Sequence, residues 1–452
     1  MKKKLLSLFS VFVTLCVLLP SVNVNAAGFT SSYQPQCSAI ELVNLNTGAV
    51  VYEKNPNKKQ YPASTTKIMT YIIASEKIKD LDGTKITVSK KVVDKLLGTG
   101  SSLSGIQVND VLTAKQLLNL MMVPSGNDAA LVLADYVGGG DVDAFVDLMN
   151  QKAKQLGCTG THFVNPHGLQ DENHYTTAHD LALITKYAMS LPYFTEITSQ
   201  TVYRCTPVGG PRAGTTFSKS TTNLLINKNG EGGGKYYYQY AKGIKTGHTD
   251  EAGYCLVSTA TAEGSTYLCV ALGAPSVDAN GKAITTRGEM IDSAELYRWA
   301  FKNLQMKSIV KEQDTLAEIP LDYAWNKDSL RLVAQKNCQA MLPNNVSTGS
   351  VIIKTNVPSR VSAPVKKGQV IGTATLSYAD QTLGTVNLVA AESVERSEVL
   401  HTADKLKAVF TSVWFLIIAG IIILLLIIYI VLALIYNRKK KHLRKVKKYR
   451  KM

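Results

Sequence analysis

Residues 61–70 read YPASTTKIMT and place Ser64 three positions before Lys67, at the start of a helical stretch that follows two β-rich runs. Residues i and i+3 of a helix share a face, so the Lys67 amine can reach the Ser64 hydroxyl. A serine hydroxyl becomes a good nucleophile only when a nearby base takes its proton. Ser308 and Lys311 have the same spacing in unremarkable surroundings. The pattern therefore needs support from the rest of the chain.

Two further short motifs follow in chain order, SGN at residues 125–127 and KTG at residues 245–247, and each occurs once. Ser125 and Asn127 lie between two helical stretches, so we expect them to point into a cleft from a loop. Lys245 provides a second cation, which together with burial would lower the pKa of Lys67 and leave its amine neutral. The three motifs together indicate acyl transfer through Ser64.

The third motif precedes a β-rich run and suits the binding of an acidic group. Lys245 and Thr246 offer an ammonium and a hydroxyl, which together can hold a carboxylate. Gly247 has no side chain, and this leaves room for a substrate backbone beside the strand.

The order of the periodic patterns predicts the fold of the first domain, residues 37–304. AIELVNL (39–45) and AVVYEK (49–54) read as a hairpin, and GYCLVSTAT (253–261) and STYLCVALG (265–273) as another. Helical stretches separate the two hairpins, and Thr177 and Asp180 have capping-box spacing at the start of one of them. An amphipathic helix follows at residues 288–304. This order predicts an α+β fold, an antiparallel sheet with a helical insertion.

Residues 305–398 contain short β-type runs separated by Gly, Pro and Asn, without helical periodicity. They predict a small β-sandwich domain that carries no catalytic constellation.

Both ends of the chain have the composition of membrane-directed segments. Residues 1–26 predict a signal peptide, with a basic start, a short apolar core and small residues before a cleavage site between Ala26 and Ala27. An uncleaved anchor is the alternative. Residues 413–436 are apolar and uncharged, and at about 1.5 Å per residue they span roughly 36 Å as a helix. Residues 437–452 form a basic tail that we expect to stay cytoplasmic, with the catalytic domain outside the cell.

The charge balance follows from these ends. Three lysines at residues 2–4 and ten basic residues in the tail account for most of the net charge of +16. The exported part is therefore nearly neutral, and nucleic acid is not an expected partner. Of seven cysteines, six remain after the signal peptide, scattered without a CxxC pair. Disulfides and small buried side chains both stay open as interpretations.

Two further segments attract attention without indicating chemistry. His162, His167, His174 and His179 have loose spacings with no acid or cysteine that would complete a zinc pattern, so no metal is expected. Residues 227–241, NKNGEGGGKYYYQYA, precede the third motif and are rich in Gly and Tyr. They read as a flexible loop over the site or as a plain insertion.

The three motifs and their surroundings resemble the low-molecular-mass penicillin-binding proteins, which are serine-type D-Ala-D-Ala carboxypeptidases. YPASTTKIMT, MMVPSGNDAA, FVNPHGLQDENHYTTAHDLA, GIKTGHTDEAGYCLV and APVKKGQVIG carry the resemblance, which covers nearly all of residues 37–398. It implies a cofactor-free hydrolase of cell wall biogenesis and remodelling. Its substrate would be a peptidoglycan stem peptide ending in D-Ala-D-Ala, and β-lactams would be covalent inhibitors. Many relatives attach through an amphipathic helix on the membrane surface, whereas residues 413–436 should span the membrane.

The resemblance also implies a role for each motif residue. Ser64 would be the acylated nucleophile and Lys67 its general base, while Ser125, with Lys245, would pass a proton to the leaving D-alanine. Asn127 would hold the substrate's peptide amide, and Lys245 and Thr246 its terminal carboxylate. The backbone N–H groups of Ser64 and His248 would form the oxyanion hole.

Three alternatives share these residues. A class A β-lactamase usually carries SDN and a glutamate in an ExxLN context, and neither occurs here, so slow release of penicillin is expected. A non-catalytic β-lactam-sensing receptor would use the basic tail for signalling. A DD-endopeptidase that acts on cross-links would use the same catalytic residues.

Overall fold

The computed structural model describes residues 29, 31–96, 98–230 and 232–449. The signal peptide predicted for residues 1–26 lies outside the described residues. The chain divides into two compact units, one that ends at Ser308 and one that begins at Ile309. The short stretches Gln339–Ile352 and Ser377–Leu383 group with the first unit.

The first unit is built on a five-stranded antiparallel sheet with the strand order β2-β1-β9-β8-β7. Its strands are β1 (Ala39–Asn44), β2 (Val50–Lys54), β7 (Ala241–Thr249), β8 (Gly253–Ala262) and β9 (Ser265–Ala274). Because β1 pairs with β9, the N-terminal hairpin and the later strands form one sheet, although about 200 residues separate them. Both predicted hairpins and the predicted antiparallel sheet are confirmed.

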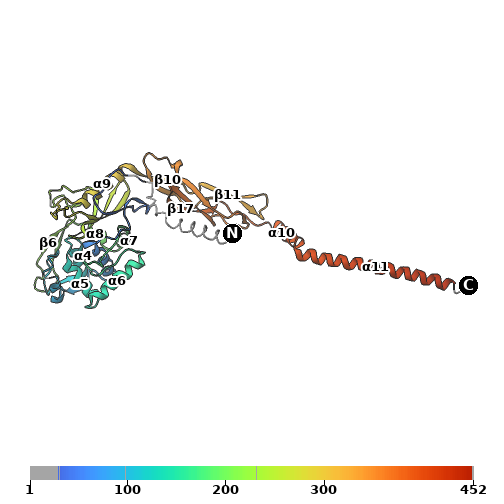
Figure 1. Cartoon of the computed structure of the whole chain (residues 1–452), viewed down its shortest axis with the longest axis horizontal. Coiled ribbons are helices and arrows are strands. Elements are labelled where there is room, and N and C mark those ends of the chain that lie inside the picture. Colours follow the sequence, from blue (N-terminus) through green and yellow to red (C-terminus); the bar gives the residue numbers. More distant parts are fainter. Residues whose placement is uncertain (1–28, 30, 97, 231, 450–452) are drawn as a thin grey trace, which may run out of the picture. The chain divides into compact units, whose positions relative to one another are not determined.

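The helical insertion covers one face of this sheet. Its main helices are α2 (Lys67–Lys77), α4 (Ala114–Met122), α5 (Asn127–Val137), α6 (Val142–Gln155) and α7 (Ala178–Ala188). Along β9, Leu268, Val270 and Leu272 belong to the core on the side of these helices, whereas Tyr267, Cys269 and Ala271 belong to a second core. This alternation follows from the period of two in a strand. Helix α9 (Gly288–Asn303) packs on the second core, opposite α4 and α5 (Figure 1).

The structure differs from the prediction at three local points. Ser64 lies in a 3-10 turn, Ala63–Thr66, and α2 begins only at Lys67. The Thr177 hydroxyl caps α7, but the Asp180 carboxylate bonds to the loop at Gly160 and Thr161 instead of closing a capping box. The third motif lies inside β7 instead of at its entrance. Shorter elements went unpredicted because they are too short to show a period: β3 (Lys85–Thr87), α3 (Lys90–Asp94), β4 (Val111–Thr113), α8 (Phe194–Thr198), β5 (Val202–Cys205) and β6 (Phe217–Ser220).

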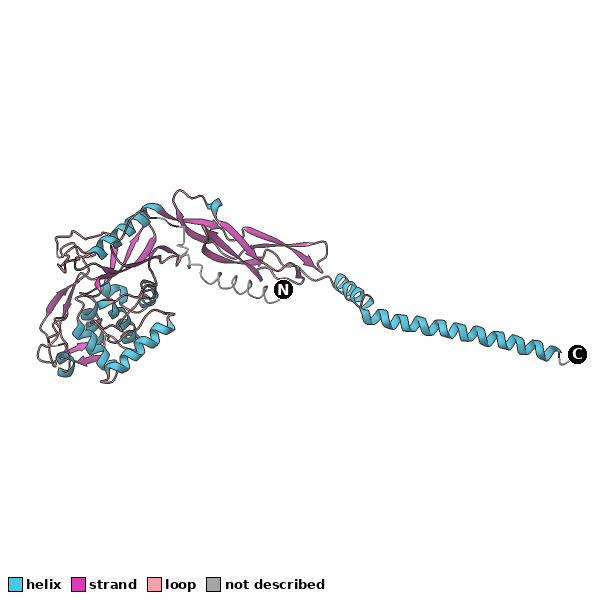
Figure 2. Ribbon diagram, viewed as in Figure 1, coloured by secondary structure: helices cyan, strands magenta, loops and turns pink. Residues whose placement is uncertain are grey.

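Residues 305–398 are β-rich, as predicted (Figure 2). Six strands form one sheet with the order β14-β16-β17-β12-β11-β15, and β10 pairs with β13 in a separate sheet. The strands are β10 (Leu304–Val310), β11 (Thr315–Asp322), β12 (Ser329–Ala334), β13 (Cys338–Pro343), β14 (Ile352–Asn356), β15 (Val361–Ser362), β16 (Val370–Tyr378) and β17 (Gln381–Ala390).

The chain ends in two helices, α10 (Glu398–Phe410) and α11 (Val413–Tyr449). Within α11, Val413–Lys440 has a mean hydropathy of 3.5 over its most apolar window, and none of that window is buried. Among the described residues this is the one helix long and apolar enough to cross a membrane. The predicted apolar helix is therefore present, and it continues into the basic tail. The six cysteines of the described chain are unpaired, and five of them are buried, which matches their interpretation as small apolar side chains.

Candidate active site

Ser64 lines a cleft of 350 Å³ in the first unit. The residue before it, Ala63, has a φ of +45°, a left-handed conformation that is costly for a residue other than glycine. Two side chains of the motif hold this turn, because the Thr65 hydroxyl donates to the Pro62 carbonyl at 2.6 Å and the Thr66 hydroxyl to the Ala63 carbonyl at 2.8 Å. Both threonines therefore stabilise the turn that directs the Ser64 hydroxyl into the cleft.

His174 supports the same turn from the neighbouring loop. Its Nδ1 accepts the backbone N–H of Val164 at 3.0 Å, so the ring proton lies on Nε2, which donates to the Thr66 oxygen at 2.7 Å. Burial lowers the pKa of His174 to about 4, so the ring is neutral near pH 7. Gly168 completes the support, because a Cβ there would lie 1.9 Å from the Ala63 oxygen.

The Lys67 side chain is fully buried and its Nζ has three partners. These are Ser64 Oγ at 2.7 Å, Asn127 Oδ1 at 2.6 Å and the backbone carbonyl of His167 at 2.8 Å. The amide oxygen and the carbonyl only accept, whereas the serine hydroxyl can also donate. A neutral amine that gives its two N–H groups to the two fixed acceptors therefore directs its lone pair at Ser64. This is the geometry of a general base.

The electrostatics favour that neutral amine. Burial lowers the pKa of Lys67 well below its usual value, and the positive charge of Lys245 lowers it further, against the opposing effect of the Asp128 carboxylate. Lys245 is itself buried, and desolvation lowers its pKa to about 7. The structure therefore brings together the two lysines that the sequence pairs.

The second motif lies between α4 and α5. Ser125 has a φ of +66° and is 5% exposed at the cleft, and Asn127 is the first residue of α5. The Asn127 N–H donates to the carbonyl of Ser102, another residue of the cleft wall. Asp128 anchors the same loop by accepting the N–H groups of Ser104 and Gly105. The second motif therefore also fixes a wall of the cleft.

The third motif lies in β7, the edge strand of the sheet. Thr246 lines the cleft, and its hydroxyl lies 2.5 Å from that of Thr222. A Cβ at Gly247 would lie 2.8 Å from the Pro62 oxygen and 3.1 Å from the Ser64 nitrogen. The missing side chain therefore makes room for the turn that carries the nucleophile, whereas the sequence suggested room for the substrate. Ser64 therefore lies beside Gly247, the residue that precedes His248 in β7.

Gly247→Ala tests this close approach. The added methyl must displace either β7 or the Ser64 turn, and we expect acylation by penicillin to slow by about 100-fold, the scale of a misplacement near 1 Å. Stopped-flow acylation measures the effect. The control is Gly349→Ala, in the short turn before β14, where the nearest contact of a new Cβ is 3.7 Å, and it should acylate normally. An unchanged rate in Gly247→Ala would show that the strand and the turn adjust freely.

Six of the eight predicted site residues line this one cleft, and the two lysines lie buried behind it. Sequence reasoning missed Thr222, Tyr254 and Arg287, which also line it. Arg287 precedes α9 and forms an ion pair with the buried carboxylate of Glu289. A single arginine between a strand and a helix carries no signal in the sequence, so only its position in space reveals it.

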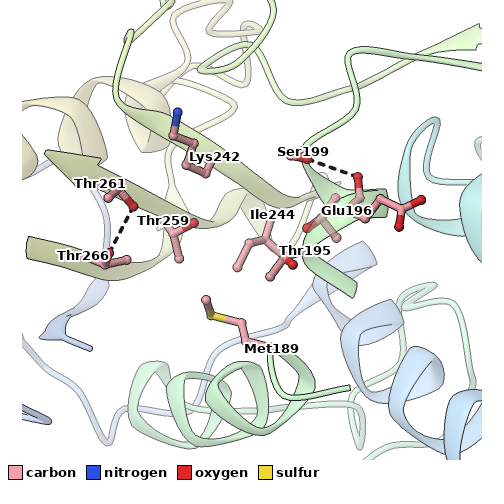
Figure 3. Close-up of a pocket in the computed structure, with 10 residues that line it drawn as sticks. Met189, Thr195, Glu196, Ser199, Lys242, Ile244, Thr259, Thr261 and Thr266 are labelled. Atoms are coloured by element: carbon pink, nitrogen blue, oxygen red, sulfur yellow. Dashed lines mark hydrogen bonds between the residues drawn. The ribbon is translucent and has the colours of Figure 1, made fainter. Parts of the chain in front are cut away.

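A larger cavity of 520 Å³ lies along the first half of β7 (Figure 3). Figure 3 shows the side chains of Ile244 and Met189 directed into it, and none of the predicted site residues lines it. The full lining is Met189, Thr195, Glu196, Thr198, Ser199, Lys242, Ile244, Thr259, Thr261 and Thr266. Without a paired nucleophile and base among these residues, this cavity does not suit the chemistry of the cleft.

Comparison with protein families matches both units. Residues 29–276 match the peptidase S11 family, described as D-alanyl-D-alanine carboxypeptidase. Residues 304–396 match the C-terminal domain of penicillin-binding protein 5.

Individual relatives agree with these matches. The D-alanyl-D-alanine carboxypeptidase DacF of Bacillus subtilis is 29% identical over 400 residues, which cover 87% of this chain and 95% of that protein. The D-alanyl-D-alanine carboxypeptidase of Streptomyces sp. strain K15 is 32% identical over 278 residues, which cover 59% of this chain and 91% of that protein. The crystal structure of penicillin-binding protein 5 from Haemophilus influenzae aligns with a TM-score of 0.64 at 27% identity, covering 81% of this chain and 100% of that one.

Proposed function

The chain belongs to the peptidase S11 family of D-alanyl-D-alanine carboxypeptidases, and on this basis we propose that it removes the terminal D-alanine from peptidoglycan stem peptides through an acyl-enzyme on Ser64. The main support for this proposal is the hydrogen bond between Lys67 Nζ and Ser64 Oγ. Lys67 takes the hydroxyl proton while Oγ attacks the carbonyl of the penultimate D-alanine. The C–N bond then breaks, and Ser125, with Lys245, returns a proton to the leaving amine. Water hydrolyses the ester and releases the shortened peptide.

The proposed oxyanion hole consists of the backbone N–H groups of Ser64 and His248. Its support is the contact between Gly247 and the Ser64 nitrogen, which puts the two backbones side by side. A donor of this kind contributes about 3–4 kcal/mol to transition-state stabilisation. Asn127, whose Oδ1 is occupied by Lys67, keeps its NH₂ group for the carbonyl of the substrate amide.

We assign the terminal carboxylate of the substrate to Thr246 and Arg287. Both residues line the cleft, whereas Lys245 is 1% exposed and its Nζ donates to the Thr246 carbonyl at 2.9 Å. Lys245 then acts through its charge, without contact with the carboxylate. An arginine fork beside a hydroxyl suits a carboxylate better than a point charge does.

A pair of substrates tests the proposed reaction. The purified protein should release D-alanine from a pentapeptide that ends in D-Ala-D-Ala faster than it cleaves a cross-linked dimer of the same peptide. Faster cleavage of the dimer would make the protein a DD-endopeptidase. Release from neither substrate would refute the proposal and favour the receptor alternative.

The lining of the cleft also bears on the β-lactamase alternative. Among the described residues that line it, none is an aspartate or a glutamate. A carboxylate that activates water is what class A β-lactamases use for deacylation. We therefore propose that β-lactams acylate Ser64 and leave slowly, as inhibitors and not as substrates.

The two lysines predict the pH dependence of D-alanine release. Lys67 must lose its proton to act as a base, and since its pKa is lowered, the rate rises with pH until that pKa is passed. Lys245 must keep its proton, and since its pKa is about 7, kcat/KM falls again as the pH rises through this value. Lys245→Arg keeps its charge at higher pH, so its falling limb should move upward by at least one pH unit. An unmoved limb would show that Lys245 does not govern it.

The proposed membrane arrangement follows the sequence prediction. Residues 1–26 are removed on export, residues 37–304 and 305–398 lie outside the cell, residues 413–436 span the membrane and residues 437–452 stay in the cytoplasm. The support is the exposed apolar helix that ends in basic residues.

Protease added to intact protoplasts should degrade the catalytic domain and spare the tail. Deletion of residues 437–452 should leave wall chemistry unchanged, whereas a lost transcriptional response would favour a receptor.

A further inference from the structure

The Gly- and Tyr-rich segment, residues 227–241, is held against α9 and not over the cleft. Tyr238 is 7% exposed, belongs to the core beneath α9 and stacks on Tyr297 with ring centroids 6.0 Å apart. Its backbone N–H donates to the Leu225 carbonyl at 2.9 Å. Among the described residues of the segment, none lines the cleft. The interpretation of the segment as a loop over the site therefore does not match this placement.

One side chain of the segment contacts a residue that lines the active-site cleft. The Tyr236 hydroxyl accepts the backbone N–H of Arg287 at 3.1 Å. Arg287 is the residue from which α9 starts, and no side-chain hydrogen bond of its own caps the helix. The tyrosine therefore holds the backbone at the point where the chain turns from the cleft into α9.

The side chain of Arg287 is held from two other directions. Its Nε lies 2.8 Å and its Nη2 2.6 Å from Glu289 Oε1, and this carboxylate is fully buried. Its Cζ lies 4.5 Å from the centre of the Tyr254 ring, which also stacks on His248 of β7. Two of the five guanidinium N–H groups are used by Glu289, and three remain for a ligand. Backbone and side chain are thus both fixed before a substrate arrives.

We propose that Tyr236 is a positioning residue that fixes Arg287 for the terminal carboxylate, and that this one hydrogen bond strengthens the preference of the enzyme for a free C-terminal carboxyl group over an amide. The inference rests on the proposed function, because it requires Arg287 to meet the substrate carboxylate. A preorganised arginine binds a carboxylate without the cost of ordering its own side chain. A substrate whose C-terminus is an amide gains nothing from this arrangement.

Tyr236→Phe tests the proposal, because it keeps the ring and removes the hydroxyl. With a pentapeptide ending in D-Ala-D-Ala, we expect KM to rise about fivefold and kcat to stay within twofold, as one neutral hydrogen bond is lost. With the same peptide carrying a C-terminal amide, KM should not change. The preference for acid over amide should therefore fall about fivefold.

The matched control is Tyr237→Phe in the same segment, where the side chain is 38% exposed. It should retain the full preference, and Arg287→Ala should lose more of it than Tyr236→Phe does. An unchanged preference in Tyr236→Phe would overturn the inference, and so would an equal loss on both substrates, which indicates a general structural defect. Failure of the unmodified protein to release D-alanine from the pentapeptide with the free C-terminal carboxyl group would instead refute the proposed function.

Discussion

Ser64→Ala is expected to lower D-alanine release by a factor on the order of 10⁶, the scale seen when a serine hydrolase loses its nucleophile. The same variant should take up no labelled penicillin, whereas the unmodified protein should hold the label on Ser64 for many minutes. The physical reason is that Lys67 can act as a base only if residue 64 carries a hydroxyl group for it to deprotonate. Removing one oxygen atom should leave the fold intact, and a thermal melt will check this.

The matched control is Ser308→Ala. Ser308 has the same spacing to Lys311 as Ser64 has to Lys67, but it is exposed on β10. It should release D-alanine at the normal rate. Equal release by Ser64→Ala and the unmodified protein would refute the covalent mechanism altogether. Rapid loss of the penicillin label would instead make the protein a β-lactamase.

Lys67→Met is expected to slow acylation by about 10²–10⁴-fold, the usual contribution of a general base. It should also destabilise the protein, because Asn127 Oδ1 and the His167 carbonyl lose their buried donor. An unsatisfied buried acceptor costs about 1–3 kcal/mol. Stopped-flow acylation by penicillin gives the first effect, and denaturant unfolding gives the second.

The control for this prediction is Lys77→Met, at the exposed end of the same helix α2. It should change neither quantity by much. Acylation within tenfold of normal in Lys67→Met would mean that another group takes the Ser64 proton. A large loss of stability without loss of acylation would assign Lys67 to folding alone.

The parts of the fold that could be predicted are those with a recognisable local pattern in the sequence. The two hairpins, the main helices and the β-rich second domain all have periods long enough to recognise. The short elements between α2 and β7 do not, and Asp180 shows why local rules fail at single residues. It has the spacing of a capping-box partner, yet its carboxylate is used by a loop about 20 residues earlier. At Asp180, tertiary contacts therefore outweigh the local capping motif.

The candidate site divides in the same way. All eight residues named from the motifs lie in or directly behind one cleft, because the motifs state which chemical groups are needed. Arg287, Tyr236 and His174 could not be assigned from the sequence, because what places each of them at the site is a contact with a residue distant in the chain, namely Tyr254, Arg287 and Thr66.

By itself the sequence determined the order of strands and helices, the apolar C-terminal helix and the set of groups for acyl transfer. Only the tertiary structure decided how these groups act. The direction of the Lys67 lone pair depends on acceptors 60 and 100 residues away, and the need for glycine at position 247 depends on the Ser64 turn. A sequence lists donors, acceptors and charges, whereas a pKa or a close approach depends on burial and distance, which exist only once the chain has folded.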